Sequence, residues 1–403
     1  MNLSAGLAAL RRPRVLFLIG FAIACLYGRG SEESLAAPTR NREVPPAAWH
    51  QLERAARHGD AEAQYRLGAT YLEGQGVEPD PKKAVEWYTQ AARNGSAPAQ
   101  AALGLLYTVG LGVERDFHQA FDWSRRAAER GDALGEWSLG VLYAHGLGVE
   151  QDYSRAAEWY RKAAEAGQAE AQYSLGRLFA KGRGVERNPA TAAFWYRKAA
   201  EQGYVPALFR LGVAYAKGAG VSLDYGQAAF WLKRAAQEGD PLAQSDLAVL
   251  YAEGKGVSQD PKEAAAWWQR AAEQGEVKAQ DNLGAAYEAG QGVQSDLSTA
   301  ALWYRKAAEH GYPPAARHLA RLYEDGRGVP RDLAEAALWY RKAAEMGDVV
   351  AERELGHLYL SNEESKANRE EAEAWLEKAA EQGDAEAKEE LSLLEKAAKP
   401  RTR

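Results

Sequence analysis

A glycine recurs every 36 residues along almost the whole chain, and this spacing constrains the fold more than any other feature. The glycines stand at 59, 95, 131, 167, 203, 239, 275, 311, 347 and 383, with no insertion or deletion between them. A fixed period of a few tens of residues is typical of a solenoid, in which each unit packs only on its neighbours. The sequence therefore predicts nine repeats over residues 60–383. Positions within a repeat are numbered so that Asp60 is position 1 and Gly95 is position 36.

The first half of each repeat has the apolar spacing of a helix. Positions 4, 8 and 12 hold Ala63, Leu67 and Tyr71, which fall on one helical face. Position 9 is glycine or alanine in all nine repeats. Because a mid-helix glycine costs about 0.5–1 kcal/mol relative to alanine, its recurrence predicts close approach of a neighbouring helix.

A turn and a second helix follow. Gly-x-Gly-Val occupies positions 15 to 18 in eight repeats, and we expect its first glycine to end the first helix in the left-handed conformation. A phosphate-binding loop would need a preceding strand, which the pattern does not provide. Asp80 and Pro81 are typical of a helix start. Tryptophan fills position 28 in all nine repeats and is expected in the core, while Arg197 and Lys198 and their equivalents are expected in solvent.

The N-terminus differs from the array. Residues 1–28 combine three arginines with a 14-residue apolar run, which predicts a secretory signal because a spanning helix needs about 20 residues. Cleavage after Ala36, lipidation at Cys25 and retention as an N-terminal membrane signal are all open. A twin-arginine signal at Arg11-Arg12 is weaker because its flanking residues are missing. Residues 29–46 are predicted to be a flexible polar linker. The protein is expected in the periplasm or cell envelope, soluble or anchored through its N-terminus.

The ends of the array are predicted to be caps. Residues 47–59 match only the second helix of a repeat and residues 384–399 only the first, with 400–403 as a disordered tail. Cys25 is the sole cysteine, so no intramolecular disulfide can hold the array. A net charge of −6 lacks the basic excess that nucleic-acid binding requires.

The motifs Ala-x-x-x-Leu-Gly-x-x-Tyr, Gly-x-Gly-Val and Trp-Tyr-x-x-Ala-Ala, at a period of 36, resemble the Sel1-like repeat (SLR) family, relatives of the tetratricopeptide repeats. The resemblance implies an all-α, right-handed α-solenoid of helix-turn-helix repeats. It also implies an adaptor that assembles protein complexes, in bacteria often exported. Some secreted, cysteine-rich relatives are associated with β-lactam binding or hydrolysis, but this chain lacks their repeated cysteine pairs.

Catalytic motifs are not evident. The seven histidines form no His-Glu-x-x-His pattern, and no serine lies in a Gly-x-Ser-x-Gly or Ser-x-x-Lys arrangement. We therefore expect no catalytic, metal or cofactor site.

The residues that vary between repeats are the candidates for function. Positions 6, 10 and 13 correspond to those that line the concave groove of tetratricopeptide relatives. The hypothesis is that a partner protein or peptide binds an apolar half of this groove and places acidic residues against a basic half. The candidate residues are Tyr65, Trp137, Tyr173 and Phe209 in the apolar half and Arg317, Arg321 and Arg353 in the basic half. The alternative is that the aromatic residues fill space between adjacent helices.

The sequence thus predicts an exported, non-catalytic scaffold. An envelope hydrolase or carbohydrate-associated factor and a membrane-tethered regulator of a signalling protein are the alternatives.

Overall fold

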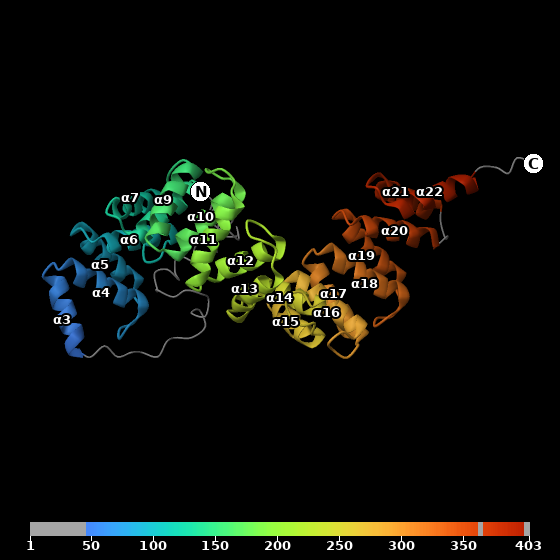
Figure 1. The fold of residues 1–403 in the computed structure, drawn as a ribbon, viewed down its shortest axis with the longest axis horizontal. Helices are drawn as coiled ribbons and strands as arrows, with labels where there is room; N and C mark the ends of the chain where they lie inside the picture. Colours follow the sequence, from blue (N-terminus) through green and yellow to red (C-terminus); the bar gives the residue numbers. More distant parts are fainter. Residues whose placement is uncertain (1–45, 362–365, 399–403) are drawn as a thin grey trace, which may run out of the picture. The chain divides into compact units, whose positions relative to one another are not determined.

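The computed structural model describes residues 46–361 and 366–398, and every regular element in these ranges is an α-helix (Figure 1). The chain divides into two compact units, residues 1–234 and 235–403. Within each unit, helices that follow one another in the sequence pack together. The predicted all-α solenoid of paired helices is confirmed.

The helices have nearly uniform length. The first unit contains α3 (Pro46–Arg57), α4 (Ala61–Glu73), α5 (Pro81–Arg93), α6 (Ala97–Val109), α7 (Phe117–Ala128), α8 (Ala133–His145), α9 (Tyr153–Glu165), α10 (Ala169–Lys181), α11 (Pro189–Glu201) and α12 (Val205–Lys217). The division between the units falls within α13 (Tyr225–Gln237). The second unit contains α14 (Pro241–Glu253), α15 (Pro261–Glu273), α16 (Val277–Ala289), α17 (Leu297–Glu309), α18 (Pro313–Asp325), α19 (Leu333–Glu345), α20 (Val349–Ser361), α21 (Lys366–Glu381) and α22 (Ala385–Ala398).

The helix ends follow the predicted chemistry. Gly74 ends α4 with φ 72° and its N–H donates to the Thr70 carbonyl, as expected of a left-handed C-cap. Asp80 accepts a hydrogen bond from the Lys83 N–H at 3.0 Å and caps α5, with Pro81 in the first turn.

The second glycine of the loop has a role that the sequence did not reveal. Gly328 has φ +73°, and a Cβ there would overlap the backbone of Leu297, the first residue of α17 in the preceding repeat. Gly112 meets Pro81 and Gly148 meets Phe117 in the same way. The loop of one repeat therefore rests on the start of the preceding repeat's second helix.

The small residue at position 9 allows the two helices of a repeat to meet, as predicted. A Cβ on Gly284 would lie 2.7 Å from the Tyr304 ring, and one on Gly68 would lie 2.7 Å from the Tyr88 ring. These distances are too short for a real methyl group, so the ring of position 29 occupies the space that glycine leaves open.

The core prediction for position 28 was only partly right. Trp231, Trp267 and Trp339 are buried, whereas the other six tryptophans of this position are half-buried: Trp87, Trp123, Trp159, Trp195, Trp303 and Trp375. The position that faces the glycine is the next one, and its Tyr304 and Tyr340 are almost fully buried. In the six repeats with a half-buried tryptophan, the side chain of position 29 packs against the glycine of position 9 instead.

The basic pairs at positions 30 and 31 are also more than a solvated surface. The Lys342 Nζ lies 3.8 Å from the centroid of the Trp339 ring, and six other repeats place the position 31 cation over their tryptophan in the same way. Arg341 donates to the Tyr359 hydroxyl at 2.7 Å. These cations cover exposed ring surface and tie one repeat to the next.

A glutamine at position 5 joins successive repeats through its amide. Gln244 Nε2 donates to the Ala236 carbonyl at 3.1 Å, and its Oε1 accepts from Gln274 Nε2 at 2.8 Å. Repeats 1 and 4 contain the same pair of bonds, made by Gln64 with Asn94 and by Gln172 with Gln202. Buried amides of this kind are stable only when both of their groups are satisfied.

The N-terminal predictions lie outside the described residues. These are the signal over 1–28, Cys25, the cleavage site after Ala36 and nearly all of the linker over 29–46. The tail over 400–403 is also outside. None of the helices in the described ranges has the length and apolar character needed to cross a membrane.

Candidate partner-binding surface

The four aromatic candidates of position 6 differ in exposure. Trp137 and Tyr173 are only 4% and 9% exposed, and Tyr173 packs against the rings of Tyr196 and Tyr204. Tyr65 and Phe209 are half-buried. Trp137 and Tyr173 therefore fill space between helices, and of these four only Tyr65 and Phe209 present ring surface to a partner.

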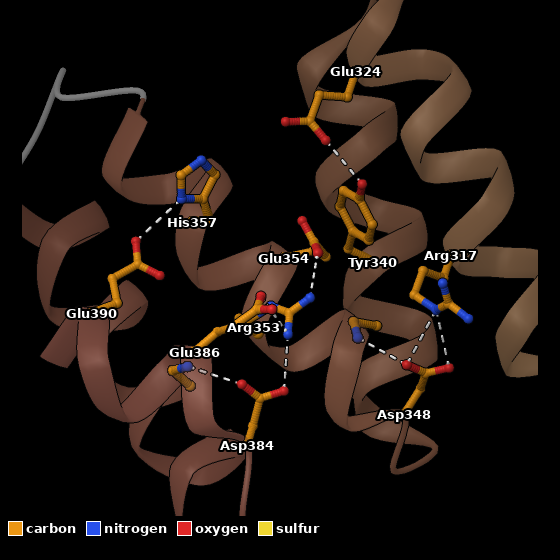
Figure 2. Close-up of polar contacts among 12 residues, drawn as sticks. Arg317, Glu324, Tyr340, Asp348, Arg353, Glu354, His357, Asp384, Glu386 and Glu390 are labelled. Atoms are coloured by element: carbon orange, nitrogen blue, oxygen red, sulfur yellow. Dashed lines mark hydrogen bonds and ion pairs between the residues drawn. The ribbon is translucent and has the colours of Figure 1, made fainter.

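Two of the basic candidates, Arg317 and Arg353, are engaged within the protein (Figure 2). Arg317 Nε lies 3.4 Å from Asp348 Oδ1. Arg353 lies 3.1 Å from Asp384 and also contacts Glu354 at 2.9 Å. In both cases, position 6 pairs with the helix-capping aspartate of the next segment, so the charge of these arginines is already balanced.

Arg321 shares its partner with two other groups. Its Nη2 lies 3.3 Å from Glu288 Oε1, as does the Nη1 of Arg327. The Tyr304 hydroxyl donates to the other oxygen, Oε2, at 2.9 Å. Burial, together with the charge of Glu288, raises the pKa of Tyr304, so this phenol stays a neutral donor. The three predicted arginines therefore do not form an unpaired basic cluster.

Position 6 of repeat 7 is also satisfied internally. Asp281 is 7% exposed, and its Oδ1 lies 2.8 Å from His318 Nδ1. The His318 ring packs against Tyr304 at 5.0 Å between centroids. His318 therefore has a packing role between repeats 7 and 8. Across the described ranges, the His, Cys, Asp and Glu side chains form no group of three that could hold a metal ion.

Repeats 4 and 5 contain several arginines that form no ion pair with a carboxylate of the described residues. Arg177, Arg187 and Arg210 are exposed, and no carboxylate of the described residues forms an ion pair with them. Arg177 occupies position 10, the same position as Arg321. The signal in the sequence is position 13, which is alanine in repeats 3 to 6 and glutamate in repeats 7 and 8.

A second surface feature was also missed. Position 27 is acidic in repeats 1 to 3 but carries an exposed apolar side chain in four later repeats: Phe194, Phe230, Leu302 and Leu338. Lys198 lies 5.4 Å from the Phe194 centroid and Arg234 lies 5.9 Å from that of Phe230. This position belongs to the second helix of the repeat, outside the positions considered for the groove.

The comparisons with known proteins agree on one family. The Sel1 repeat family model matches nine consecutive segments: 61–96, 97–132, 133–168, 169–204, 205–240, 241–276, 277–312, 313–348 and 349–384. No curated protein matches the chain.

Two solved structures are similar over most of the chain. One is a protective antigen of uropathogenic Escherichia coli with an SLR fold, at 38% identity and a TM-score of 0.77, covering 85% of this chain and 73% of the antigen. The other is a Sel1 repeat protein from Oxalobacter formigenes, at 35% identity and a TM-score of 0.56, covering 82% of this chain and 96% of that protein. With nine matched repeats in phase, the chain belongs to the Sel1 repeat family.

Proposed function

We propose that this protein is an exported, non-catalytic scaffold that assembles a protein complex by binding a segment of its partner. Solenoids of Sel1 and tetratricopeptide-like repeats typically mediate contacts between proteins, and Sel1 repeat scaffolds are typically non-catalytic. The partner, the binding site and the place of action belong to the proposal.

The observation that carries the proposal is that the recurring residues of the repeat form its structural contacts, whereas the variable residues include surface side chains. The residues that recur form the caps, the helix contacts and the loop contacts described above. The residues that vary include side chains that packing does not require, such as the exposed Arg177 and Phe194 and the half-buried Phe209. A rigid frame with a variable surface is the arrangement expected of a binding module.

Site-directed photo-cross-linking in cells tests the proposal. A photoreactive phenylalanine analogue replaces Tyr65 in one variant and Phe209 in another, and a third variant carries it at the exposed Glu158 of α9 as the control. We expect a discrete cross-linked protein from Tyr65 or Phe209 that is missing from Glu158. The same pattern from all three variants, or cross-linking to no protein, would count against a partner-binding groove.

Export is tested separately by mass spectrometry of the mature N-terminus. Export with lipidation predicts a modified Cys25, and export as a soluble protein predicts a free Ala37. An N-terminus that begins at Met1 would contradict both forms.

A further inference from the structure

A small cavity lies between α10, α11 and α12, within repeats 4 and 5. Its volume is about 240 Å³. The residues around it include four cations, Arg177, Lys181, Arg187 and Arg210, and a floor of small or aromatic side chains, Ala192, Ala193, Tyr196, Val213 and Ala214. This set is called the cationic pocket below.

The three arginines of the pocket form no ion pair with a carboxylate of the described residues. The lining residues include no carboxylate. The Arg177 and Arg210 guanidinium groups lie over the rings of Tyr173 and Phe209, at 5.7 and 5.6 Å from the centroids, and Arg187 Nε donates to the Ala180 carbonyl at 3.4 Å. These contacts orient the arginines but leave their positive charge without a counter-charge.

Comparison with the corresponding arginine in repeat 8 shows that the missing ion pair results from a difference in sequence between the repeats. Arg321 also occupies position 10, but it pairs with Glu288 at position 13 of the preceding repeat. The residue equivalent to Glu288 for Arg177 is Ala144. Arg177 thus lacks the glutamate of the preceding repeat that pairs with Arg321.

The floor of the pocket limits what can fill it. Ala192, Ala193 and Tyr196 are buried, and burial keeps the Tyr196 phenol neutral. Pockets for drug-sized ligands usually measure about 300–1,000 Å³, so this one is small for a cofactor. Its size suits one or two amino-acid side chains. A free hydrated anion would gain nothing from the apolar floor, because it has no apolar surface to bury there.

We propose that the cationic pocket binds an acidic segment of the partner protein, with an apolar side chain on the alanine and tyrosine floor and flanking Asp or Glu carboxylates on Arg177, Arg187 and Arg210. The inference rests on the proposed scaffold function, because it assigns that function a site and a partner chemistry. Arginine suits this role because its planar fork can accept a carboxylate through two parallel hydrogen bonds.

Direct binding of synthetic peptides to the full chain tests the inference. The probes are fluorescein-labelled peptides in which Leu and Glu alternate, and matched peptides with Gln in place of every Glu. Fluorescence anisotropy is measured for wild type, for the double variant Arg177→Gln/Arg210→Gln and for the control double variant Arg125→Gln/Arg155→Gln. The control removes the same charge from exposed arginines that have local carboxylate partners, Glu129 and Asp152.

We expect wild type and the control to bind the Glu peptides more tightly than the Gln peptides. Removal of two arginine contacts at the pocket rim should weaken binding of the Glu peptides about tenfold. Circular dichroism confirms that each variant remains helical.

Several outcomes overturn the inference. These are equal affinity for Glu and Gln peptides, no measurable binding of the Glu peptides, an equal loss in the control variant, or displacement by inorganic phosphate at a concentration comparable to the peptide. The photo-cross-link from position 65 separates the failure of this inference from the failure of the scaffold function. If the cross-link persists when Arg177→Gln and Arg210→Gln are added, the scaffold function stands without this pocket. If the chain with unchanged arginines gives no cross-link from position 65 or 209, the scaffold function itself fails.

Discussion

Tyr196 shows how the position of a single residue in the repeat determines its chemistry. Its ring fills the space opposite Gly176 and forms part of the floor of the cationic pocket. Burial raises its pKa from the usual 10.0 to about 12, against the opposing influence of Arg210 and Arg177. The neutral phenol is therefore part of the folded state over the whole physiological range.

An alkaline titration should reveal this burial. Between about pH 10 and 12, the unfolded chain releases the Tyr196 proton while the folded chain retains it, so the free energy of unfolding falls as pH rises. One such group contributes a slope of at most about 1.4 kcal/mol per pH unit. Tyr196→Phe removes this contribution, and guanidinium unfolding at a series of pH values should show a shallower alkaline loss than in wild type. Identical pH dependence in the two chains would refute the assignment.

Arg177 and Arg321 differ in the same way in their ion pairing. Both occupy position 10, yet only Arg321 has a carboxylate within ion-pair distance. The chemistry of a repeat position is therefore decided by residues about 30 positions away in the neighbouring repeat.

The glutamine contacts between helices are incomplete in two repeats. Gln100 and Gln280 donate to their carbonyls as the others do, but their Oε1 atoms are buried without a partner. The residue at position 35, which supplies the missing donor elsewhere, is Arg130 in one repeat and His310 in the other. Arg130 donates to the Gly95 carbonyl instead, and His310 Nδ1 lies 2.7 Å from the Lys306 carbonyl oxygen.

We expect His310→Gln to stabilise the second unit. Gln274 and Gln382 donate both to the side chain of position 5 and to a carbonyl in their own helix, so a glutamine at 310 can satisfy Gln280 Oε1. A hydrogen bond to a buried acceptor that lacks one contributes about 0.5–1.5 kcal/mol. Chemical denaturation measures the gain, and the matched loss is Gln274→Ala, which leaves Gln244 Oε1 without its donor. A loss of stability in His310→Gln would contradict this account.

The loop glycines provide a test of the contact between one repeat and the next. Gly328 and Gly347 both have positive φ, +73° and +86°. Gly347 has nothing within 4 Å of a Cβ, whereas a Cβ on Gly328 overlaps Leu297. Gly347→Ala should cost about 1–2 kcal/mol for the left-handed backbone alone, and Gly328→Ala about 1–3 kcal/mol more for the overlap. Equal losses in thermal unfolding would mean that the loop does not depend on this contact.

The limits of sequence reasoning follow from the same elements. The 36-residue period predicted the helices, the Asp80 cap, the left-handed glycine and the close approach at Gly284, because these depend on residues within one repeat. The period could not show that position 29 rather than position 28 fills the centre of the core. Side chains at adjacent positions differ only in their direction around the helix axis, and the period does not fix that direction.

Ion pairs between residues of neighbouring repeats could not be predicted from the pattern of one repeat either. Arg317 and Arg353 were predicted to face a partner because their type departs from the other repeats, but each has an aspartate 31 residues later in the chain. A check of charged residues one repeat away would have separated these arginines from Arg177. The pocket itself depends on side chains from three helices, so no single repeat contains its pattern.

At the scale of the whole array, stability is local. Within each unit, the described helices pack mainly on the helices that precede and follow them, so the effect of a mutation should stay in its neighbourhood. The core residues of repeats 7 to 9, such as Tyr304, Trp339 and Leu355, form one buried cluster within the second unit.

A substitution in this cluster should therefore loosen only its neighbourhood. Trp339→Ala removes a ring that is 4% exposed and should cost about 3–5 kcal/mol. Hydrogen–deuterium exchange should show faster exchange in α17 to α20, while α5 and α6 of the first unit keep their protection. Leu338→Ala is the matched control, because the Leu338 side chain is 44% exposed and its removal should change stability by no more than about 0.5 kcal/mol. Faster exchange throughout the chain after Trp339→Ala would instead require cooperativity that extends beyond neighbouring repeats.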